Sequence, residues 1–397
     1  MGHILVTAGA VSSAAMTDGS SARAPGSVSD PSELPGTSRP CLRVVVDGAI
    51  LSRPPTGTAR WVRGLSAALD RLPDMDVVLV SGPAHIRRGG RLHRIPNLAR
   101  ERWWYENGIN RIARRERADA MLMPSNLTAR PGRIPQVVTV LDVNFLTQAD
   151  TYERSFVRYA TWAYRRSIRD ATHATTISEF SRSEIARHLD VDPARLEVIY
   201  PGLDEVPPGM VGAAPHDGPY ALYVGATERH KNVGLLLDAW RDRSPAGLAL
   251  VIVGQPGRDH DMVLERAAGC RGRVIVRGRV DAEELERWYR HASVFLFPSR
   301  VEGFGYPPLE AMQRGVPVVS STGGSLPEVL GDGALYFDPD DHLAVIGHVE
   351  GLMADETGRM ELVNRGFGVA GRFTWLRTAQ AMSSALRQAV AENGWGS

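Results

Sequence analysis

The sequence predicts an α/β protein of two tandem domains, each built on a doubly wound parallel sheet. Its 397 residues exceed the size of one ordinary domain. Short β-branched runs alternate with amphipathic helical stretches, and this pattern occurs twice, on either side of a segment rich in Pro, Gly and Ala. Because alternation of strand and helix is typical of βαβ units, we expect two Rossmann-like domains.

The first alternation begins at Cys41. Buried strands are expected at 42–46, 77–80, 120–123, 136–140, 174–177 and 196–200, with helices at 59–72, 100–117 and 151–170. Ser181 and Glu184 have the spacing of a capping box, so a helix is expected to start at Ser181. Residues 207–219 have no periodicity and are expected to form a linker.

The second alternation predicts strands at 220–225, 248–254, 274–276, 294–297 and 318–320, with helices at 233–241, 281–291 and 309–314. The expected organisation is a first domain over 41–206, a second over 220–372, and a helix within 373–397 that packs back toward the first domain. Residues 1–40 are rich in Ser, Ala, Gly and Pro and are expected to be a disordered extension. A ligand should bind in the cleft at the carboxyl ends of the strands.

Charge and composition exclude several classes of protein. The formal net charge is +1, from 46 basic and 45 acidic residues, so no nucleic-acid partner is expected. Cys41 and Cys270 lie far apart and form no Cys-x-x-Cys pair, which argues against a thiolate zinc site and fits a cytoplasmic protein. The longest apolar runs, such as 248–253, are far shorter than the ~20 residues that cross a bilayer.

A glycine loop in the second domain is the strongest chemical signal. Gly303 and Gly305 follow the strand expected at 294–297, and Pro307 precedes a predicted helix. The free amides and the dipole of such a helix start favour an anion such as a pyrophosphate. No Gly-x-Gly-x-x-Gly follows the first strand and no Walker lysine motif is present, which argues against a dehydrogenase and a P-loop enzyme.

Glu302 and Glu310 flank this glycine loop, and three interpretations stay open. Paired carboxylates serve retaining hydrolases when they stand ~5 Å apart. With a glycine-rich loop between them, the two acids more plausibly accept hydrogen bonds from separate hydroxyl pairs of one extended ligand. Alternatively, Glu302 is a solvated loop residue and Glu310 only complements the helix dipole.

Lys231 is the single lysine among the 46 basic residues. The 294–320 string, with Glu302, seven intervening residues, Glu310 and then Gly-Val-Pro-Val-Val at 315–319, closely resembles family 4 of the retaining glycosyltransferases. The string 223–232, which ends in Lys231 and Asn232, looks like that family's donor-phosphate loop. Looser matches are Gly57-Thr58-Ala59-Arg60-Trp61, 178–181 and 200–204, so the resemblance covers residues from about 42 to 390.

The resemblance implies a GT-B fold and transfer of a sugar from a nucleotide-diphosphate donor, with retention at the anomeric carbon and with neither metal nor cofactor. It implies that Glu310 holds the donor ribose and that Glu302 contacts the donor sugar. Lys231 would grip the pyrophosphate, a role in which an ammonium and a guanidinium are not interchangeable. Other donor-side residues implied by it are Gly57, Gly225, Gly303, Phe304 and Gly305.

Two positions depart from the family pattern. The family commonly has His before the acceptor-side Asp, whereas this chain has Leu141 before Asp142, so an imidazole role cannot be transferred. The donor loop usually carries Arg directly before Lys, whereas His230 stands there and Arg229 lies one step earlier. Arg229 is accordingly the expected second cation at the pyrophosphate, with a solvent-facing arginine as the equal alternative.

Residues 85–117 carry ten arginines against three glutamates, interleaved with Trp103, Trp104 and Tyr105. This composition suits peripheral contact with an anionic membrane or a lipid-linked acceptor. It also suits a phosphorylated soluble acceptor, with Arg87 and Arg88 as acceptor-side residues. An arginine-rich solvent face in an arginine-biased sequence is the third interpretation.

The sequence thus predicts a cytoplasmic retaining glycosyltransferase whose acceptor is phosphorylated or is an antibiotic intermediate. Assembly of cell-surface polysaccharide or glycolipid at the membrane is the alternative within the same class. A nucleotide-sugar epimerase or a non-catalytic nucleotide-sugar-binding protein of the same fold is the alternative of another class.

Overall fold

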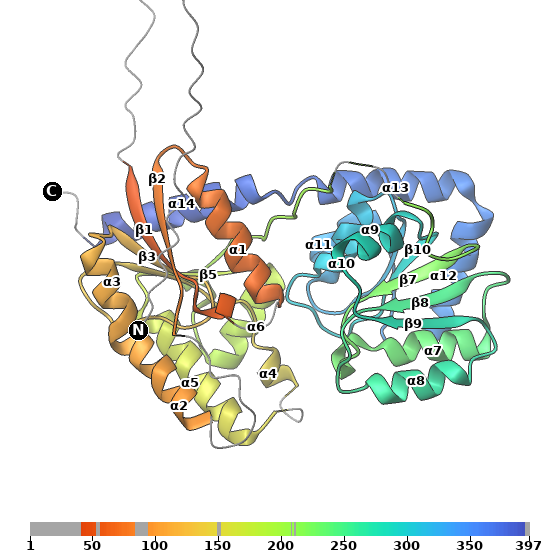
Figure 1. Cartoon of the computed structure of the whole chain (residues 1–397), viewed down its shortest axis with the longest axis horizontal. Helices are drawn as coiled ribbons and strands as arrows, with labels where there is room; N and C mark the ends of the chain where they lie inside the picture. The colour runs from red at the N-terminus through yellow and green to blue at the C-terminus, as the bar shows by residue number, and fades with distance from the viewer. Residues whose placement is uncertain are drawn as a thin grey trace, which may run out of the picture.

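The computed structural model of the chain describes residues 41–52, 56–83, 94–148, 152–207, 209 and 212–393. It consists of two α/β domains that lie side by side (Figure 1). The extension expected over residues 1–40 lies outside the described residues. Within the described part of the chain, no helix combines the length and the apolar character that crossing a lipid bilayer requires.

The first domain is built on a six-stranded sheet in the order β2-β1-β3-β4-β5-β6, and all neighbouring strands are parallel. Every side chain of β3 and β4 is buried, as is typical of a parallel sheet with helices on both faces. The strands are β1 (Leu42–Asp47), β2 (Met75–Val80), β3 (Ala120–Met123), β4 (Gln136–Thr139), β5 (His173–Thr176) and β6 (Leu196–Val198).

Helices cover both faces of this sheet. Trp61 packs on one face, whereas Ile109 and Ile168 pack on the other. Thr56 caps α1, because its hydroxyl accepts the amide of Ala59 at 3.2 Å. The helices are η1 (Ala49–Ser52), α1 (Gly57–Asp70), α2 (Arg94–Trp103), η3 (Trp104–Gly108), α3 (Ile109–Arg115), α4 (Asn144–Thr147), α5 (Arg154–Asp170), α6 (Glu179–Leu189) and η5 (Pro193–Arg195).

The second domain repeats this plan with a parallel sheet in the order β12-β11-β10-β7-β8-β9. Its strands are β7 (Tyr220–Val224), β8 (Ala249–Val253), β9 (Val274–Gly278), β10 (Val294–Phe297), β11 (Val318–Ser321) and β12 (Ala334–Phe337). The two parallel sheets with their covering helices confirm the predicted fold class. The four-residue β12 lies at the sheet edge and is not among the predicted strands.

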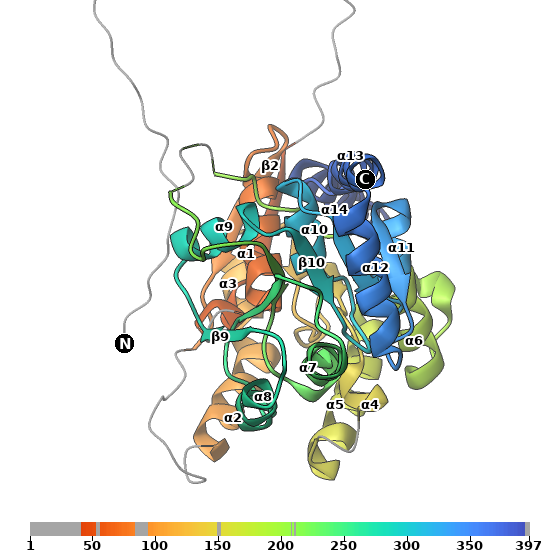
Figure 2. The same cartoon turned by 90° about the vertical axis from the view of Figure 1, so that its right-hand side faces the viewer.

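Helices again lie on both sides of the second sheet. Helices α7 and α8 cover one side, and α9, α10 and α13 cover the other (Figures 1 and 2). The helices are η6 (Arg229–Lys231), α7 (Val233–Asp242), α8 (His260–Ala268), α9 (Ala282–Arg290), α10 (Tyr306–Gln313), α11 (Leu326–Leu330), η7 (Gly331–Gly333), α12 (His342–Ala354) and α13 (Glu356–Ala370).

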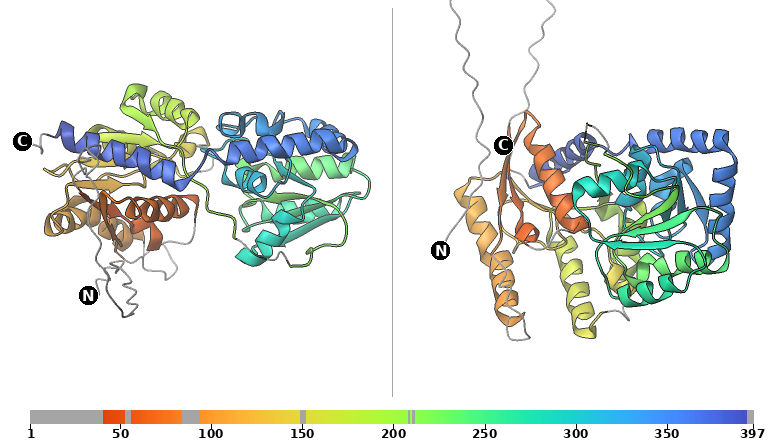
Figure 3. Two further views of the ribbon diagram at one scale, coloured as in Figure 1. Left: turned by 90° about the horizontal axis from the view of Figure 1, so that it is seen from above. Right: turned by 45° about the vertical axis from the view of Figure 1, so that its right-hand side comes forward.

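The last helix, α14 (Trp375–Glu392), returns to the first domain and packs on α1 and on β3, β4 and β5 (Figure 3). Where the chain crosses between domains, the amide of Leu203 donates to the carbonyl of Phe373 at 3.0 Å. The described residues of the segment expected to be a linker run without helix or strand and contact α9, where Arg290 donates to the carbonyl of Pro207 at 3.0 Å.

Two predicted helix positions are wrong. Helix α6 begins at Glu179, because Ser178 is its cap and accepts the amide of Ser181 at 3.0 Å, so Ser181 lies inside the helix instead of starting it. The helix expected over 100–117 is interrupted by the π-helical turn η3. The wider turn lets the Trp104 indole and the Tyr105 hydroxyl donate to the buried Asp47 carboxylate, at 3.0 and 3.2 Å.

Candidate functional site

A cavity of about 1000 Å³ lies between the two domains. We call it the interdomain cleft. Its first-domain wall comes from the start of α1 and the loops after β4 and β5, and its second-domain wall comes from η6, the start of α10 and one side of α9. The predicted site residues that line it are Gly57, Asp142, Lys231, Glu302, Gly303, Phe304, Gly305 and Glu310.

Lys231 and Glu302 form an ion pair in this cleft, with Nζ 2.6 Å from Oε1. Their side chains are only 20% and 12% exposed. Lys231 ends η6, and the next residue, Asn232, adopts the left-handed conformation and donates its side-chain amide to the carbonyl of Pro339. This anchor fixes the turn that carries the lysine. The ammonium also lies 5.8 Å from the centroid of the Phe297 ring.

Glu310 also lines the cleft and has two partners. Its carboxylate forms an ion pair with Arg60 of α1 and accepts the Tyr289 hydroxyl at 2.7 Å. Arg60 also pairs with Asp204, at 2.9 Å. Burial acts to lower the pKa of the Arg60 guanidinium, but Glu310 and Asp204 raise the pKa above its ordinary value. Arg60 thus stays charged and joins α1 of the first domain to Glu310 of the second domain.

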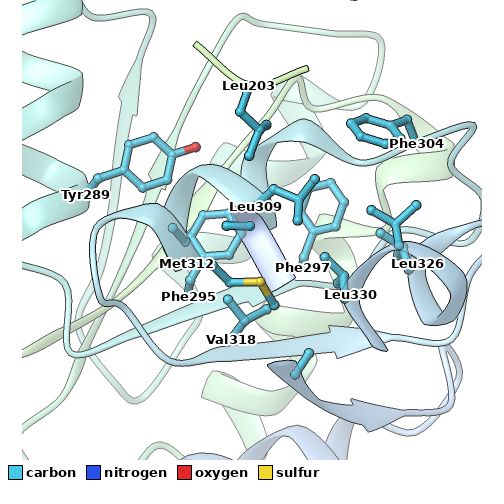
Figure 4. Packing of buried hydrophobic residues seen from close by; sticks show 14 of the residues in the cluster. Leu203, Tyr289, Phe295, Phe297, Phe304, Leu309, Met312, Val318, Leu326 and Leu330 are labelled. Carbon is cyan, nitrogen blue, oxygen red and sulfur yellow. The ribbon is translucent and has the colours of Figure 1, made fainter. Parts of the chain in front are cut away.

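The glycine loop joins these two carboxylates. Gly305 has a φ of +93°, and a side chain there would approach Leu326 to 2.8 Å, so both conformation and space favour glycine. Phe304 is buried and packs edge-on against Tyr306 and Phe373. Figure 4 shows Phe304, Leu309 and Leu326 in the apolar cluster beneath the loop. The core therefore fixes the loop position.

Asp142 faces the Lys231–Glu302 pair from the first domain. It follows β4, and its carboxylate accepts the amide of Asn144 at 3.0 Å. Loss of hydration raises the pKa of Asp142, and the charge of Glu302 adds to this rise, against the Asn144 hydrogen bond and the charge of Lys231. Burial likewise lowers the pKa of His230 beside Lys231.

Two of the predicted site residues, Arg229 and Gly225, do not line this cleft, and two others fall outside the part of the chain that the structure describes. Arg229 lines a neighbouring cavity of about 700 Å³ and not the interdomain cleft. Gly225 follows β7 and packs closely on Gly254, since a Cβ added at Gly254 would lie 2.0 Å from the Gly225 carbonyl oxygen. Arg87 and Arg88 lie outside the described residues.

The first domain also contacts the glycine loop directly. The hydroxyl of Ser178 donates to the carbonyl of Gly303 at 2.7 Å. Glu328 of α11 accepts the amides of Glu179 and Phe180 at the start of α6, at 2.7 and 2.9 Å, and the hydroxyl of Tyr200 at 2.8 Å. A carboxylate at a helix N-terminus is favoured by the helix dipole. These contacts hold the two domains together beside the cleft.

Comparisons with known proteins agree with this architecture. Residues 55–206 match the family described as Glycosyltransferase Family 4, and residues 211–368 match the family described as Glycosyl transferases group 1. The chain is 34% identical over 265 residues to the O-antigen chain mannosyltransferase B of Escherichia coli, which covers 62% of this chain and 68% of the relative. The chain belongs to glycosyltransferase family 4. The resemblance on which the site residues were predicted is thereby confirmed.

A second relative of this family 4 glycosyltransferase is the D-inositol 3-phosphate glycosyltransferase of Xylanimonas cellulosilytica, 31% identical over 242 residues, which are 56% of this chain and 57% of the relative. The chain thus spans little more than half of that relative. Sucrose-phosphate synthase from Thermosynechococcus elongatus has the same GT-B fold, with a TM-score of 0.70 at 18% identity over 88% of this chain and 99% of that one. Anabaena HepE in complex with UDP-glucose gives 0.63 at 16% identity, over 87% and 100%.

Two residues with partners in the cleft, Arg60 and Tyr289, and one that joins the domains beside it, Glu328, were not among the predicted ones. Arg60 lies within the Gly57–Trp61 string, one helical turn after Gly57, so its position on the cleft side of α1 was available from helical spacing. Tyr289 and Glu328 act through long-range contacts with Glu310 and with α6. No local pattern in the sequence marks either one.

Proposed function

We propose that this glycosyltransferase transfers a glycosyl group from a nucleotide-diphosphate sugar to an acceptor hydroxyl, with retention at the anomeric carbon. The observation that supports the proposal is the position of Lys231, Glu302, the glycine loop and Glu310 along one wall of one cleft. In the proposed complex, the donor sugar lies near Glu302, the diphosphate near Lys231 and the amides of the loop, and the ribose near Glu310.

The role of Lys231 follows from charge. When the bond from the anomeric carbon to the β-phosphate oxygen breaks, negative charge develops on the β-phosphate. An ammonium held in place stabilises this charge more in the transition state than in the ground state. Lys231 already lies in a partly buried position, where its charge is less screened than at the surface.

In this proposal, the Lys231–Glu302 and Arg60–Glu310 ion pairs separate when the donor binds. The diphosphate takes Lys231 from Glu302, and the freed Glu302 accepts hydrogen bonds from the donor sugar. The ribose hydroxyls take Glu310 from Arg60, which keeps Asp204 as its partner. Gly57, at the first turn of α1, faces the same space, and a Cβ at this position would meet no atom within 4 Å, so a ligand can approach its backbone closely.

We further propose that turnover needs no metal, because Lys231 supplies the cation at the leaving group. Turnover in excess EDTA should equal turnover without it, and added Mg²⁺ or Mn²⁺ should change it by less than about twofold, well below the effect of losing one transition-state contact. Loss of turnover in EDTA, restored by one of these ions, would contradict this part of the proposal.

The acceptor is proposed from the relatives. The name of the Escherichia coli relative refers to the O-antigen chain, which supports assembly of a cell-surface glycan over the modification of an antibiotic intermediate. The Xylanimonas relative's name refers to a phosphorylated acceptor, inositol 3-phosphate, which supports a phosphate group on the acceptor as the second candidate.

A donor screen followed by product analysis tests the function. UDP-, GDP- and dTDP-sugars are compared by thermal shift, because a ligand that binds the folded state raises the melting temperature. The stabilising donor is then incubated with candidate acceptors, nucleoside diphosphate release is measured, and the anomeric configuration of the product is determined by NMR. Acceptor-dependent release with a retained configuration is expected. Conversion of the donor sugar without an acceptor would instead indicate an epimerase, and donor binding without release would indicate a binding protein.

A further inference from the structure

Exposed aromatic side chains gather on two neighbouring helices of the first domain. Trp103 on α2 and Phe156, Tyr159 and Trp162 on α5 are between 44% and 57% exposed, and Tyr152 just before α5 is 38% exposed. Among large aromatic side chains of the described residues, one other, Phe367, is similarly exposed. Such a concentration of apolar surface marks a site of interaction.

Arginines are frequent in the two segments that carry these aromatic rings. Residues 99–117 and 152–170 contain eleven arginines against five acidic residues, whereas the whole chain is nearly neutral. The guanidinium of Arg111 lies 5.9 Å from the Trp103 ring, and that of Arg166 lies 5.5 Å from the Trp162 ring. We call the four helix aromatics named above and the arginines of these two ranges the aromatic-basic surface.

The two helices form one surface and not two. Arg166 of α5 lies 3.6 Å from Glu106 of η3. Tyr159 of α5 is within the electrostatic influence of Glu101 and Arg102 of α2, and burial together with Glu101 raises its pKa. Figure 3 shows α2 and α5 projecting in the same direction from the first domain.

This surface adjoins the opening between the domains. The Arg258 guanidinium of the second domain lies 5.9 Å from the ring of Tyr152, which in turn stacks on Phe156 at 5.6 Å. Thr147 and Gln148, which lead from the cleft toward α5, line the neighbouring cavity together with Arg229. An acceptor held at this surface would therefore lie beside the domain boundary.

We propose that the aromatic-basic surface docks the protein on an anionic phospholipid bilayer. Tryptophan and tyrosine rings are favoured at the membrane-water interface, and arginines are attracted to anionic headgroups. A soluble phosphorylated acceptor would account for the arginines but not for four exposed aromatic rings. The proposal goes beyond the transfer reaction, because docking requires neither donor nor acceptor.

Sedimentation with vesicles tests the docking. The full chain is spun with vesicles of phosphatidylcholine alone and with vesicles that also contain phosphatidylglycerol. Binding is expected to the second kind and to weaken strongly in 1 M salt, where the screening length falls to about 3 Å. Equal binding to both kinds of vesicle, or binding to neither, would overturn the proposal.

Paired variants identify the surface. Charge reversal by Arg154→Glu with Arg158→Glu on α5 should lower vesicle affinity at least about 25-fold, since each arginine near an anionic surface contributes about fivefold. Both residues are exposed. The matched control is Arg271→Glu on the exposed surface of the second domain. It should lower vesicle affinity by no more than about fivefold, the effect of one arginine, and the protein should still prefer vesicles that contain phosphatidylglycerol. A control that weakens binding as strongly as the α5 pair would show that charge acts without a defined surface.

The aromatic rings distinguish a bilayer from any soluble polyanion. Trp103→Ala with Trp162→Ala should lower vesicle affinity at least about tenfold while leaving binding to polyglutamate unchanged, because only a bilayer accepts buried apolar area. Leu343→Ala, an exposed leucine on α12, is the control. A melting temperature within a few degrees of the parent would show that the variants fold. Unchanged vesicle affinity in the tryptophan variant would identify a polyanion site and overturn bilayer docking.

Discussion

Lys231 and Arg60 each bind a carboxylate that is proposed to hold the donor. The Lys231–Glu302 and Arg60–Glu310 pairs keep charged side chains neutralised within a partly buried cleft. An unpaired charge in such a place would be costly, so the pairs make it possible for the cleft to exist without ligand. At the residue scale, the donor site is therefore charged but internally balanced.

Removal of the lysine tests its role in the reaction. Lys231→Ala should lower turnover roughly 100- to 1000-fold, as loss of one preorganised contact to a developing charge does in other enzymes. Acceptor-dependent release of nucleoside diphosphate is the measurement, and donor-induced thermal shift verifies that the fold is intact. Lys231→Arg keeps the positive charge but not the compact ammonium. Its turnover should lie between that of the parent and that of Lys231→Ala. Parent-like turnover in Lys231→Ala would remove the lysine from the mechanism.

Asp142 gives a prediction about pH. Its folded-state pKa is raised, so the folded state binds more protons than the unfolded state between the two pKa values, and stability falls as pH rises through that window. Asp142→Asn keeps an oxygen that can accept the Asn144 amide but removes the charge. It should therefore be more stable than the parent at neutral pH, by a margin that disappears below about pH 3.9.

Chemical denaturation at several pH values measures this margin. Asp217→Asn, at an exposed position in the segment before β7, is the matched control and should show no comparable gain. A variant at position 142 that is less stable than the parent at neutral pH would mean that the carboxylate is held by favourable contacts and that the direction of the pKa shift is wrong.

At the scale of elements, helix α10 carries the glycine loop into position. Its cap, Gly305, is left-handed, and Pro307 is its second residue, where the missing amide hydrogen costs no helical hydrogen bond. Leu309 and Met312 bury its inner face. The same few residues therefore determine both the start of the helix and the path of the backbone beside the donor site.

Two glycine substitutions test whether position 305 requires a left-handed backbone. Gly305→Ala should lower the free energy of unfolding by about 1–2 kcal/mol, the cost of a left-handed alanine, with a further loss where its side chain meets Leu326. Gly347→Ala, in the exposed middle of α12 with open space around it, should raise stability by about 0.5–1 kcal/mol. Urea denaturation measures both. Equal effects of the two substitutions would show that position 305 has no special backbone demand.

At the scale of the whole molecule, the two domains are joined beside the cleft by polar contacts. Glu328 binds the start of α6, and Ser178 binds the carbonyl of Gly303. Each contact joins a side chain of one domain to the backbone of the other, so both contacts depend on the relative position of the domains. The described arrangement is therefore one in which the first domain supports the glycine loop.

Loss of Glu328 should loosen this arrangement. Glu328→Ala removes the acceptor of two exposed amides and of the Tyr200 hydroxyl, which should make the joined arrangement less favourable by about 1 kcal/mol. We expect a larger radius of gyration in small-angle scattering and faster amide exchange at Glu179 and Phe180. Glu361→Ala, an exposed carboxylate on α13, is the control. Unchanged scattering and exchange would show that other contacts suffice.

Much of the fold was predictable because parallel strands are buried on both faces. Such strands appear as short apolar runs, and β3 and β10 have the predicted bounds. The edge strand β12 has the same length as β3 and β10, but its two central residues are only partly buried, so it is not a fully buried apolar strand. The π-turn η3 depends on Asp47, more than 50 residues away, so nothing in its own sequence marks it.

The site was predictable where a residue type is rare or a spacing is fixed. Lys231, Glu302 and Glu310 come together in the cleft as expected. Arg229 lines the neighbouring cavity whereas Lys231 lines the cleft, and the sequence around them does not show which way each side chain faces. The position of Arg60 was available from helical spacing, whereas its pairing with Glu310 and the role of Tyr289 depend on tertiary contacts that no local pattern marks.

The carboxylate of Glu310 already has a guanidinium and a phenol as neighbours, and any nucleotide that takes their place must first release it. The energy needed for this release is identical for uridine and guanosine donors, which carry the same ribose, because it depends on the protein side chains that separate and not on the base that arrives. It weakens both donors by a common factor and leaves the ratio between them unchanged. Selection among bases must accordingly arise where the base itself makes contact.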